Sequence, residues 1–236
     1  MITQPRITFT TIALAISVSS FIPAGQAALL TLRSGNGNAG ETDSQVHVLA
    51  GPVAGEFPAP FTAADFAAAA SGAAPFILTA TPYWIAGLDG DTQSKWISTN
   101  VDGGISEGST GLYAISFTLG PVSSASMEFT FAIDNVLGSA ETGVNAGLFL
   151  NGTAIPGSEA AYGSFDVQYI LSFPDIAALL QPGLNTLYMN AENQGAPAGF
   201  IFRAEITSTP TPEPGSAALL GLGTLGLLAR RRRAQA

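Results

Sequence analysis

Cysteine is absent from the 236 residues, histidine occurs once, and only 11% of the residues are charged. Without cysteine the chain has no disulfide, no thiolate nucleophile and no thiolate ligand for a metal. Basic residues are scarce where a folded domain is expected: residues 28–209 contain three, against sixteen acidic ones, a formal charge of −13. Such a surface repels phosphate backbones, so we expect no nucleic-acid partner, whereas divalent cations and neutral ligands remain open.

The N-terminus has the three parts of a secretory signal peptide. Arg6 supplies a positive charge, residues 7–22 are an apolar run, and "PAGQA" follows with the small residues Gly25 and Ala27. This order predicts a signal helix in residues 1–27 with cleavage before Ala28, and therefore export. A buried core helix would not explain the early arginine or the small residues at the end.

The C-terminus is a second apolar segment, flanked by a proline-rich motif and by arginines. Pro212-Glu213-Pro214 precedes fifteen uncharged residues, and Arg230, Arg231, Arg232 and Arg233 follow them. As a helix, those fifteen residues would be about 22 Å long, which spans the roughly 30 Å hydrocarbon core only with thinning or snorkelling. The positive-inside rule keeps the arginines in the cytoplasm, so the rest of the protein lies on the opposite side of the membrane, where the signal peptide directs it. A chance stop-transfer anchor is the alternative.

This tail closely resembles the PEP-CTERM sorting signal of Gram-negative bacteria, in which a Pro-Glu-Pro motif, a short transmembrane helix and an arginine cluster follow in that order. The resemblance covers residues 209–236, with a spacer at 209–214 and the helix and arginines at 215–236. It implies a precursor held transiently in the inner membrane and processed by an exosortase, a membrane protease. It also implies a mature protein at the cell surface or in the extracellular matrix, associated with exopolysaccharide and biofilm.

The region between the two tails has the pattern of an all-β domain. The whole chain has 27 glycines and 15 prolines, and this region shows short apolar runs separated by turns. Alternation predicts strands at 111–120 and 124–135, with Asp134-Asn135 ending the second, and Asn151-Gly152 predicts a hairpin. Further strands are expected at 165–172, 183–193 and 198–208, and residues 61–72 predict two helical turns capped by Thr62.

The order of these strands resembles the galactose-binding-like jelly rolls, over residues 28–208. The fold class that we expect is therefore an all-β antiparallel sandwich of the jelly-roll type, between an N-terminal signal helix and a C-terminal transmembrane helix. The resemblance implies a carbohydrate-binding or accessory module, with an exopolysaccharide or another glycan as partner.

Aromatic and polar side chains provide the candidates for a saccharide site. Tyr83, Trp84 and Trp96 are expected stacking platforms, because flat aromatic rings pack against pyranose rings; core packing is the alternative for at least two of them. Asp134, Asn135 and Asn193 fall at predicted strand ends, where polar ligand contacts gather, and turn capping explains them equally well.

Metal and catalytic signals are weak. Asp89 and Asp91 could hold Ca²⁺, but the full acidic calcium-loop pattern is missing and a solvated turn is the alternative; no other cofactor is expected. "GISEG" matches G-x-S-x-G with Ser106 at the nucleophile position, yet His47 precedes it, and triad order in that fold requires a histidine after the serine. We therefore expect that the protein is not an enzyme and that it has no catalytic residue. A secreted hydrolase using acidic residues on the sandwich is the alternative.

Overall fold

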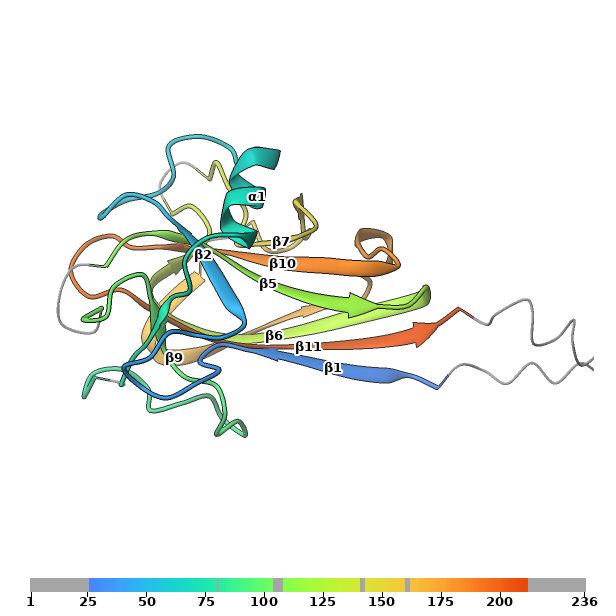
Figure 1. Ribbon diagram of the computed structural model, residues 1–236, viewed down its shortest axis with the longest axis horizontal. Helices are drawn as coiled ribbons and strands as arrows, with labels where there is room; N and C mark the ends of the chain where they lie inside the picture. The colour runs from blue at the N-terminus through green and yellow to red at the C-terminus, as the bar shows by residue number, and fades with distance from the viewer. Residues whose placement is uncertain (1–25, 80, 104–107, 141–142, 160–161, 212–236) are drawn as a thin grey trace, which may run out of the picture. The chain divides into compact units, whose positions relative to one another are not determined.

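The computed structural model describes residues 26–79, 81–103, 108–140, 143–159 and 162–211 (Figure 1). Within them the chain forms eleven strands, one α-helix and one 3₁₀-helix, and every strand pairing is antiparallel. In chain order these elements are β1 (Ala28–Arg33), β2 (Val46–Ala50), α1 (Ala63–Ala70), β3 (Phe76–Ile77), β4 (Ile97–Ser98), β5 (Gly111–Leu119), β6 (Val122–Leu137), β7 (Leu148–Leu150), β8 (Thr153–Ala154), β9 (Tyr162–Phe173), η1 (Ala177–Leu179), β10 (Gly183–Glu192) and β11 (Gly199–Pro210).

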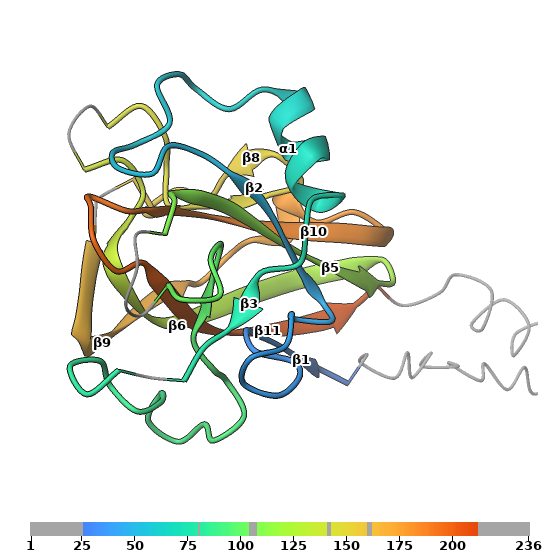
Figure 2. The same ribbon diagram turned by 60° about the vertical axis from the view of Figure 1, so that its left-hand side comes forward.

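The strands form one sheet that curls into two facing layers (Figures 1 and 2). One layer has the order β1-β11-β6-β9, and the other has β2-β5-β10-β7-β8. They are continuous because Val136 and Leu137 of β6 pair with Glu192 and Ala191 of β10. The largest apolar cluster is made of side chains from both layers, so the expected β architecture is confirmed at the level of a curled, sandwich-like antiparallel sheet.

The alternation read from the sequence holds in the two central strands. The apolar residues of alternating positions in β5 and β6 enter the main core; they are Tyr113, Ile115, Phe117, Met127, Phe129, Phe131 and Ile133. The Asn151-Gly152 turn joins β7 and β8 with φ of 52° and 82°, as a type I′ turn requires. The expected end of the strand at Asp134-Asn135 is wrong, because β6 continues to Leu137 and changes partner there.

Helix α1 packs on the outer face of the β5 and β10 layer. Thr62 caps it as predicted, with a capping box in which the Asp65 carboxylate accepts from the Thr62 backbone N–H at 2.8 Å. Phe66 and Ala69 are its buried residues, and they belong to a second apolar cluster with Tyr188 of β10. The alanine-rich segment is therefore helical because it has a cap at its start and a hydrophobic surface to cover.

A long connection between β3 and β4 covers the outer face of the other layer. Trp84 and Trp96 lie in this connection and pack on Ala132 of β6 and Ile201 of β11, forming a third apolar cluster. Ala132 and Ile201 alternate with core residues, so they point away from the main core. The connection thus supplies apolar cover for a sheet face that would otherwise meet water.

The two ends of the domain meet at one end of the sheet. Ala28, the first residue of β1, pairs with Ser208 near the end of β11. Strand β11 extends to Pro210, so the spacer expected at 209–214 begins inside the last strand. The span Gly25–Thr211 is one compact unit with its own core. The expected signal helix, transmembrane helix and sorting residues lie outside the described residues, among which no helix is long and apolar enough to cross a membrane.

Candidate ligand-binding pocket

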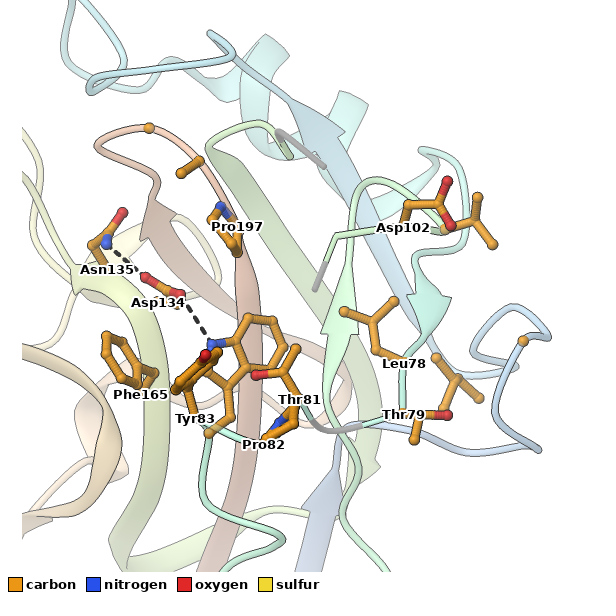
Figure 3. A pocket seen from close by; sticks show the side chains of 16 residues that line it. Leu78, Thr79, Thr81, Pro82, Tyr83, Asp102, Asp134, Asn135, Phe165 and Pro197 are labelled. Atoms are coloured by element: carbon orange, nitrogen blue, oxygen red, sulfur yellow. Dashed lines mark hydrogen bonds between the residues drawn. The ribbon is translucent and has the colours of Figure 1, made fainter. Parts of the chain in front are cut away.

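A pocket of about 840 Å³ opens where β6 nears its end and β11 begins (Figure 3). The last residue of β3 and the connection after it provide one wall, through residues 77–79 and 81–84. Residues 134–135 of β6, Phe165 of β9 and residues 195–197 before β11 provide the others. Segments distant in the sequence meet here because Asp134 pairs with Gly199 across the sheet.

Asp134 is the buried charged group of this pocket, with 7% of its surface exposed. The Trp84 indole N–H donates to Oδ2 at 3.0 Å, and the Asn135 side-chain amide donates to Oδ1 at 2.6 Å. Burial raises the pKa of Asp134 above its ordinary value, and the two hydrogen bonds oppose that rise. Each carboxylate oxygen keeps acceptor capacity for a ligand, because an ionised carboxylate accepts about four hydrogen bonds.

Asn135 is fixed on both sides of its amide. Its nitrogen donates to Asp134, and its Oδ1 accepts the backbone N–H of Gln194 at 2.8 Å. The second contact ties β6 to the turn before β11, part of which lines the pocket. The carboxylate and amide are therefore held in place before any ligand arrives, which lowers the entropic cost of binding.

Aromatic side chains form the more open side of the pocket. Tyr83 is 79% exposed, and Phe165 is also exposed on β9, at the edge of its layer. Figure 3 shows both rings beside Asp134 and Asn135. Exposed aromatic surface next to fixed polar groups is typical of sites that bind a ring with one apolar face.

The charge around the pocket has one sign. Its described lining residues include two carboxylates, Asp134 and Asp102, and no lysine, arginine or histidine. Asp102 lies on the opposite side of the view from Asp134 in Figure 3. The arrangement disfavours an anionic ligand, because nothing in the described lining would offset its charge.

Trp84 and Trp96, both predicted stacking platforms, are placed differently. The two rings pack together with centroids 4.4 Å apart. Trp84 lines the pocket and orients Asp134, whereas Trp96 is 1% exposed and donates its indole N–H to the Ile85 carbonyl at 2.9 Å. Trp96 is thus a core residue beneath Trp84, and it offers no free ring face.

Asn193 lies near the pocket without facing it. It is 1% exposed, and its amide nitrogen donates to the carbonyls of Val53 at 2.9 Å and Gly108 at 2.8 Å. Its Oδ1 accepts the backbone N–H of Gly195, which does line the pocket. Of the three polar residues predicted at strand ends, Asp134 and Asn135 line the pocket, and Asn193 shapes the turn behind it.

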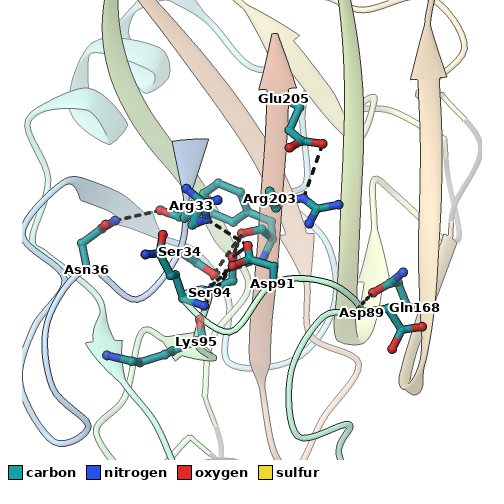
Figure 4. A network of polar contacts seen from close by, with 12 residues as sticks. Arg33, Ser34, Asn36, Asp89, Asp91, Ser94, Lys95, Gln168, Arg203 and Glu205 are labelled. Atoms are coloured by element: carbon teal, nitrogen blue, oxygen red, sulfur yellow. Dashed lines mark hydrogen bonds and ion pairs between the residues drawn. The ribbon is translucent and has the colours of Figure 1, made fainter. Parts of the chain in front are cut away.

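The predicted calcium pair does not form an oxygen cluster (Figure 4). Asp91 forms an ion pair with Arg33 at 2.9 Å and accepts the Ser94 hydroxyl at 2.7 Å. Asp89 is exposed, and its backbone N–H donates to Gln168. In the part of the chain that the structure describes, no three acidic, histidine or cysteine side chains gather to hold a metal. The calcium prediction therefore gains no support from these contacts.

The structure gives no neighbours for the serine of the G-x-S-x-G motif. Ser106 falls within residues 104–107, outside the described residues. His47 lies on β2, where its Nδ1 is 2.9 Å from the carbonyl oxygen of Gly72, just after α1. This contact gives His47 a structural function in joining β2 to the end of the helix segment.

Two pocket residues were missed by the sequence reasoning. Phe165 was expected in a strand, but its exposure follows from the edge position of β9, which no local pattern reveals. Asp102 stands in a glycine-flanked turn and resembles many solvated turn residues. Only the folded arrangement shows that both border the same pocket as Asp134.

Comparison with known proteins identifies the tail. Residues 210–233 match the PEP-CTERM protein-sorting motif. The motif marks an exported protein, made as a precursor with a C-terminal membrane anchor and later released to the cell surface. It also implies processing by an exosortase. The expectations for sorting and localisation are therefore confirmed.

The folded domain has less informative relatives. No curated protein matches the chain. Among solved structures it is similar to an isomalto-dextranase of Arthrobacter globiformis T6 complexed with panose, at 14% identity and a TM-score of 0.30. The match covers 77% of this chain and 32% of the other, so the chain spans about a third of that protein. A likeness of this strength carries no argument about function.

Proposed function

We propose that this PEP-CTERM protein is a non-catalytic surface module that binds a saccharide in the pocket around Asp134. The PEP-CTERM motif supports its delivery to the cell surface, where exopolysaccharide is the expected partner. The curled antiparallel sheet supports a jelly-roll module of the galactose-binding-like type, as the strand order suggested.

The pairing of fixed polar groups with exposed aromatic rings is the observation that carries the proposal. Asp134 and Asn135 are held by hydrogen bonds to Trp84 and Gln194, and Tyr83 and Phe165 expose their rings beside them. Sugar rings carry hydroxyl groups around their edge and C–H groups on their faces. A carboxylate and aromatic walls satisfy these two surfaces together.

The position of the pocket suits a protein sorted by its tail. The pocket lies beside Gly199, where β11 begins, and the sorting motif starts at residue 210, where β11 ends. The eleven steps along β11 between these points span about 36 Å, at roughly 3.3 Å per residue. The pocket therefore opens at the end of the domain opposite to the attachment of the motif.

A secreted hydrolase is the second candidate, and one observation favours it. Burial raises the pKa of Asp134, and a raised pKa is a property of general acids in glycosidases. Asp102 would be the second carboxylate, but glycosidases hold their two carboxyls about 5–9.5 Å apart around the scissile bond. Asp102 lines the same pocket from the turn after β4, and the turnover assay below distinguishes the two candidates.

A glycan array with the compact span 25–211, with and without Ca²⁺, tests the binding proposal. The same sugars are incubated with the protein and examined for new reducing ends. Binding without turnover, weakened by Tyr83→Ala, is the expected result. Turnover abolished by Asp134→Asn would replace the proposal with the hydrolase. Failure to bind any saccharide would leave a structural function in the matrix.

A further inference from the structure

We propose that the saccharide is cationic, a hexosamine unit whose free amine is held by Asp134. This inference rests on the proposed saccharide binding and names the chemical class of the ligand. It follows from three properties of the pocket, as its described residues form it: an ionisable group without a cationic partner, aromatic walls around that group, and a surrounding charge of one sign.

Among the described residues, Asp134 has no cationic partner of the kind that a buried carboxylate usually has. Its hydrogen-bond donors are Trp84 and Asn135, both neutral, and no basic residue belongs to the described lining of the pocket. Buried charges in proteins are normally paired, because neutral donors offset only part of the lost hydration. An ammonium group entering the pocket would supply the missing charge and two or three donors to the carboxylate.

The aromatic walls favour the same ligand. Tyr83 and Phe165 are exposed beside Asp134, as Figure 3 shows. An ammonium over an aromatic ring is attracted by the electrons of its face, while the carbon-bound hydrogens of the sugar pack on the remaining ring surface. A free hexosamine carries an ammonium group and carbon-bound hydrogens on neighbouring atoms of one ring, so it can make both contacts. A simple amine would lack the stacking surface.

The basic residues of the domain are used elsewhere. Residues 28–209 contain one lysine and two arginines, and Figure 4 shows all three on one face of the domain. Arg33 pairs with Asp91 at 2.9 Å, Arg203 lies 3.7 Å from Glu205, and the Lys95 ammonium donates to the Gly37 carbonyl. With a formal charge of −13, the domain attracts cations to the pocket and repels uronic acids.

The proposal ranks three kinds of sugar. A free amino sugar should bind best, since its charge meets Asp134. An N-acetylated sugar has the same ring without the charge, so it should retain stacking and lose the ion pair. A uronic acid should bind worst, because its carboxylate would face Asp134 and Asp102.

A matched pair of ligands tests the first two places of this ranking on the unmodified protein. The full-length chain, purified in an uncharged detergent, is titrated at pH 6 with the tetrasaccharide of β-1,4-linked glucosamine and with its N-acetylated counterpart. Tryptophan fluorescence is the readout, because the chain has two tryptophans: Trp84 lines the pocket, and Trp96 packs on it. We expect the free amine to bind about tenfold more tightly or better, the scale of one charge-assisted hydrogen bond.

Three variants locate the effect. Asp134→Asn should abolish the preference for the free amine, and Tyr83→Ala, at an exposed position that the fold does not need, should weaken both ligands. Glu128→Gln removes one negative charge from an exposed position of β6 outside the pocket, so it controls for attraction of a cation to an acidic protein. It should leave the preference unchanged.

The outcomes separate the two proposals. Equal affinity for the two tetrasaccharides overturns the cationic ligand and leaves saccharide binding intact. A preference that Glu128→Gln reduces as much as Asp134→Asn also overturns it, since the attraction would then be general. Failure of both tetrasaccharides and of neutral glucose oligomers to bind overturns saccharide binding itself.

Discussion

Replacing Trp84 by phenylalanine removes one hydrogen bond to Asp134 and keeps an aromatic ring in place. The indole N–H donates to Asp134 Oδ2 at 3.0 Å, and the ring packs on Trp96 with centroids 4.4 Å apart. A hydrogen bond to a charged group contributes about 1.5–3 kcal/mol, and the smaller ring loses about 1 kcal/mol more of packing. We expect Trp84→Phe to lower the free energy of unfolding by about 3 kcal/mol at pH 8.

The pH dependence of this loss distinguishes the two contributions. The folded pKa of Asp134 is raised above its ordinary value of 3.8, so ionisation of this group costs stability as the pH rises through the raised pKa. Loss of the Trp84 donor raises that pKa further, and each unit corresponds to 1.36 kcal/mol. The cost of Trp84→Phe should therefore be smallest below the folded pKa, where packing and a weaker hydrogen bond to the neutral carboxyl are lost, and largest above it, where the ionised carboxylate loses its donor.

Urea unfolding of the span 25–211 between pH 4 and pH 8 measures this difference. Trp96→Phe is the matched control, because Trp96 donates its indole N–H to the Ile85 carbonyl, which does not titrate. Its effect should be the same at every pH, and in each variant the remaining tryptophan reports unfolding. If Trp84→Phe costs the same at pH 4 and pH 8, the indole does not stabilise an ionised carboxylate and the reasoning about the pocket fails.

Other changes test further parts of the fold. Burial opposes the shift, but hydrogen bonds and the charge of Arg33 hold the pKa of Asp91 below 3.8. Asp91→Asn should therefore lower the free energy of unfolding by about 2 kcal/mol at pH 7, and by less as the pH falls through that lowered pKa. Urea titrations at several pH values measure this cost, which would be constant if the ion pair contributes nothing. A Cβ on Gly199 would lie 2.3 Å from the Trp84 ring, so Gly199→Ala should displace the indole and change the near-ultraviolet circular dichroism, and an unchanged spectrum would contradict the close contact. Thr62→Ala removes the cap of α1 and should lower the thermal midpoint by an amount equivalent to about 1 kcal/mol, whereas Thr62→Ser should preserve it.

Much of the fold can be predicted from the sequence, because its signals are local. Alternation placed Phe129 and Phe131 in the core, and the cap at Thr62 placed the helix. Asn151-Gly152 predicted a turn that needs positive φ at both positions. The end of β6 was wrong because polar residues at 134–135 look like a strand end, while pairing with neighbouring strands continues the strand through them.

The sequence by itself determined the destination of the chain, since a sorting signal is read as a linear order of proline-rich motif, apolar run and arginines. Tertiary structure alone decided which polar and aromatic residues meet. The sequence predicted the same function, ring stacking, for Trp84 and Trp96. In the structure Trp84 orients the Asp134 carboxylate in the pocket, whereas Trp96 is buried beneath Trp84. Exposure depends on which strand lies at an edge and which loop covers a face, and those are properties of contacts between segments far apart in the chain.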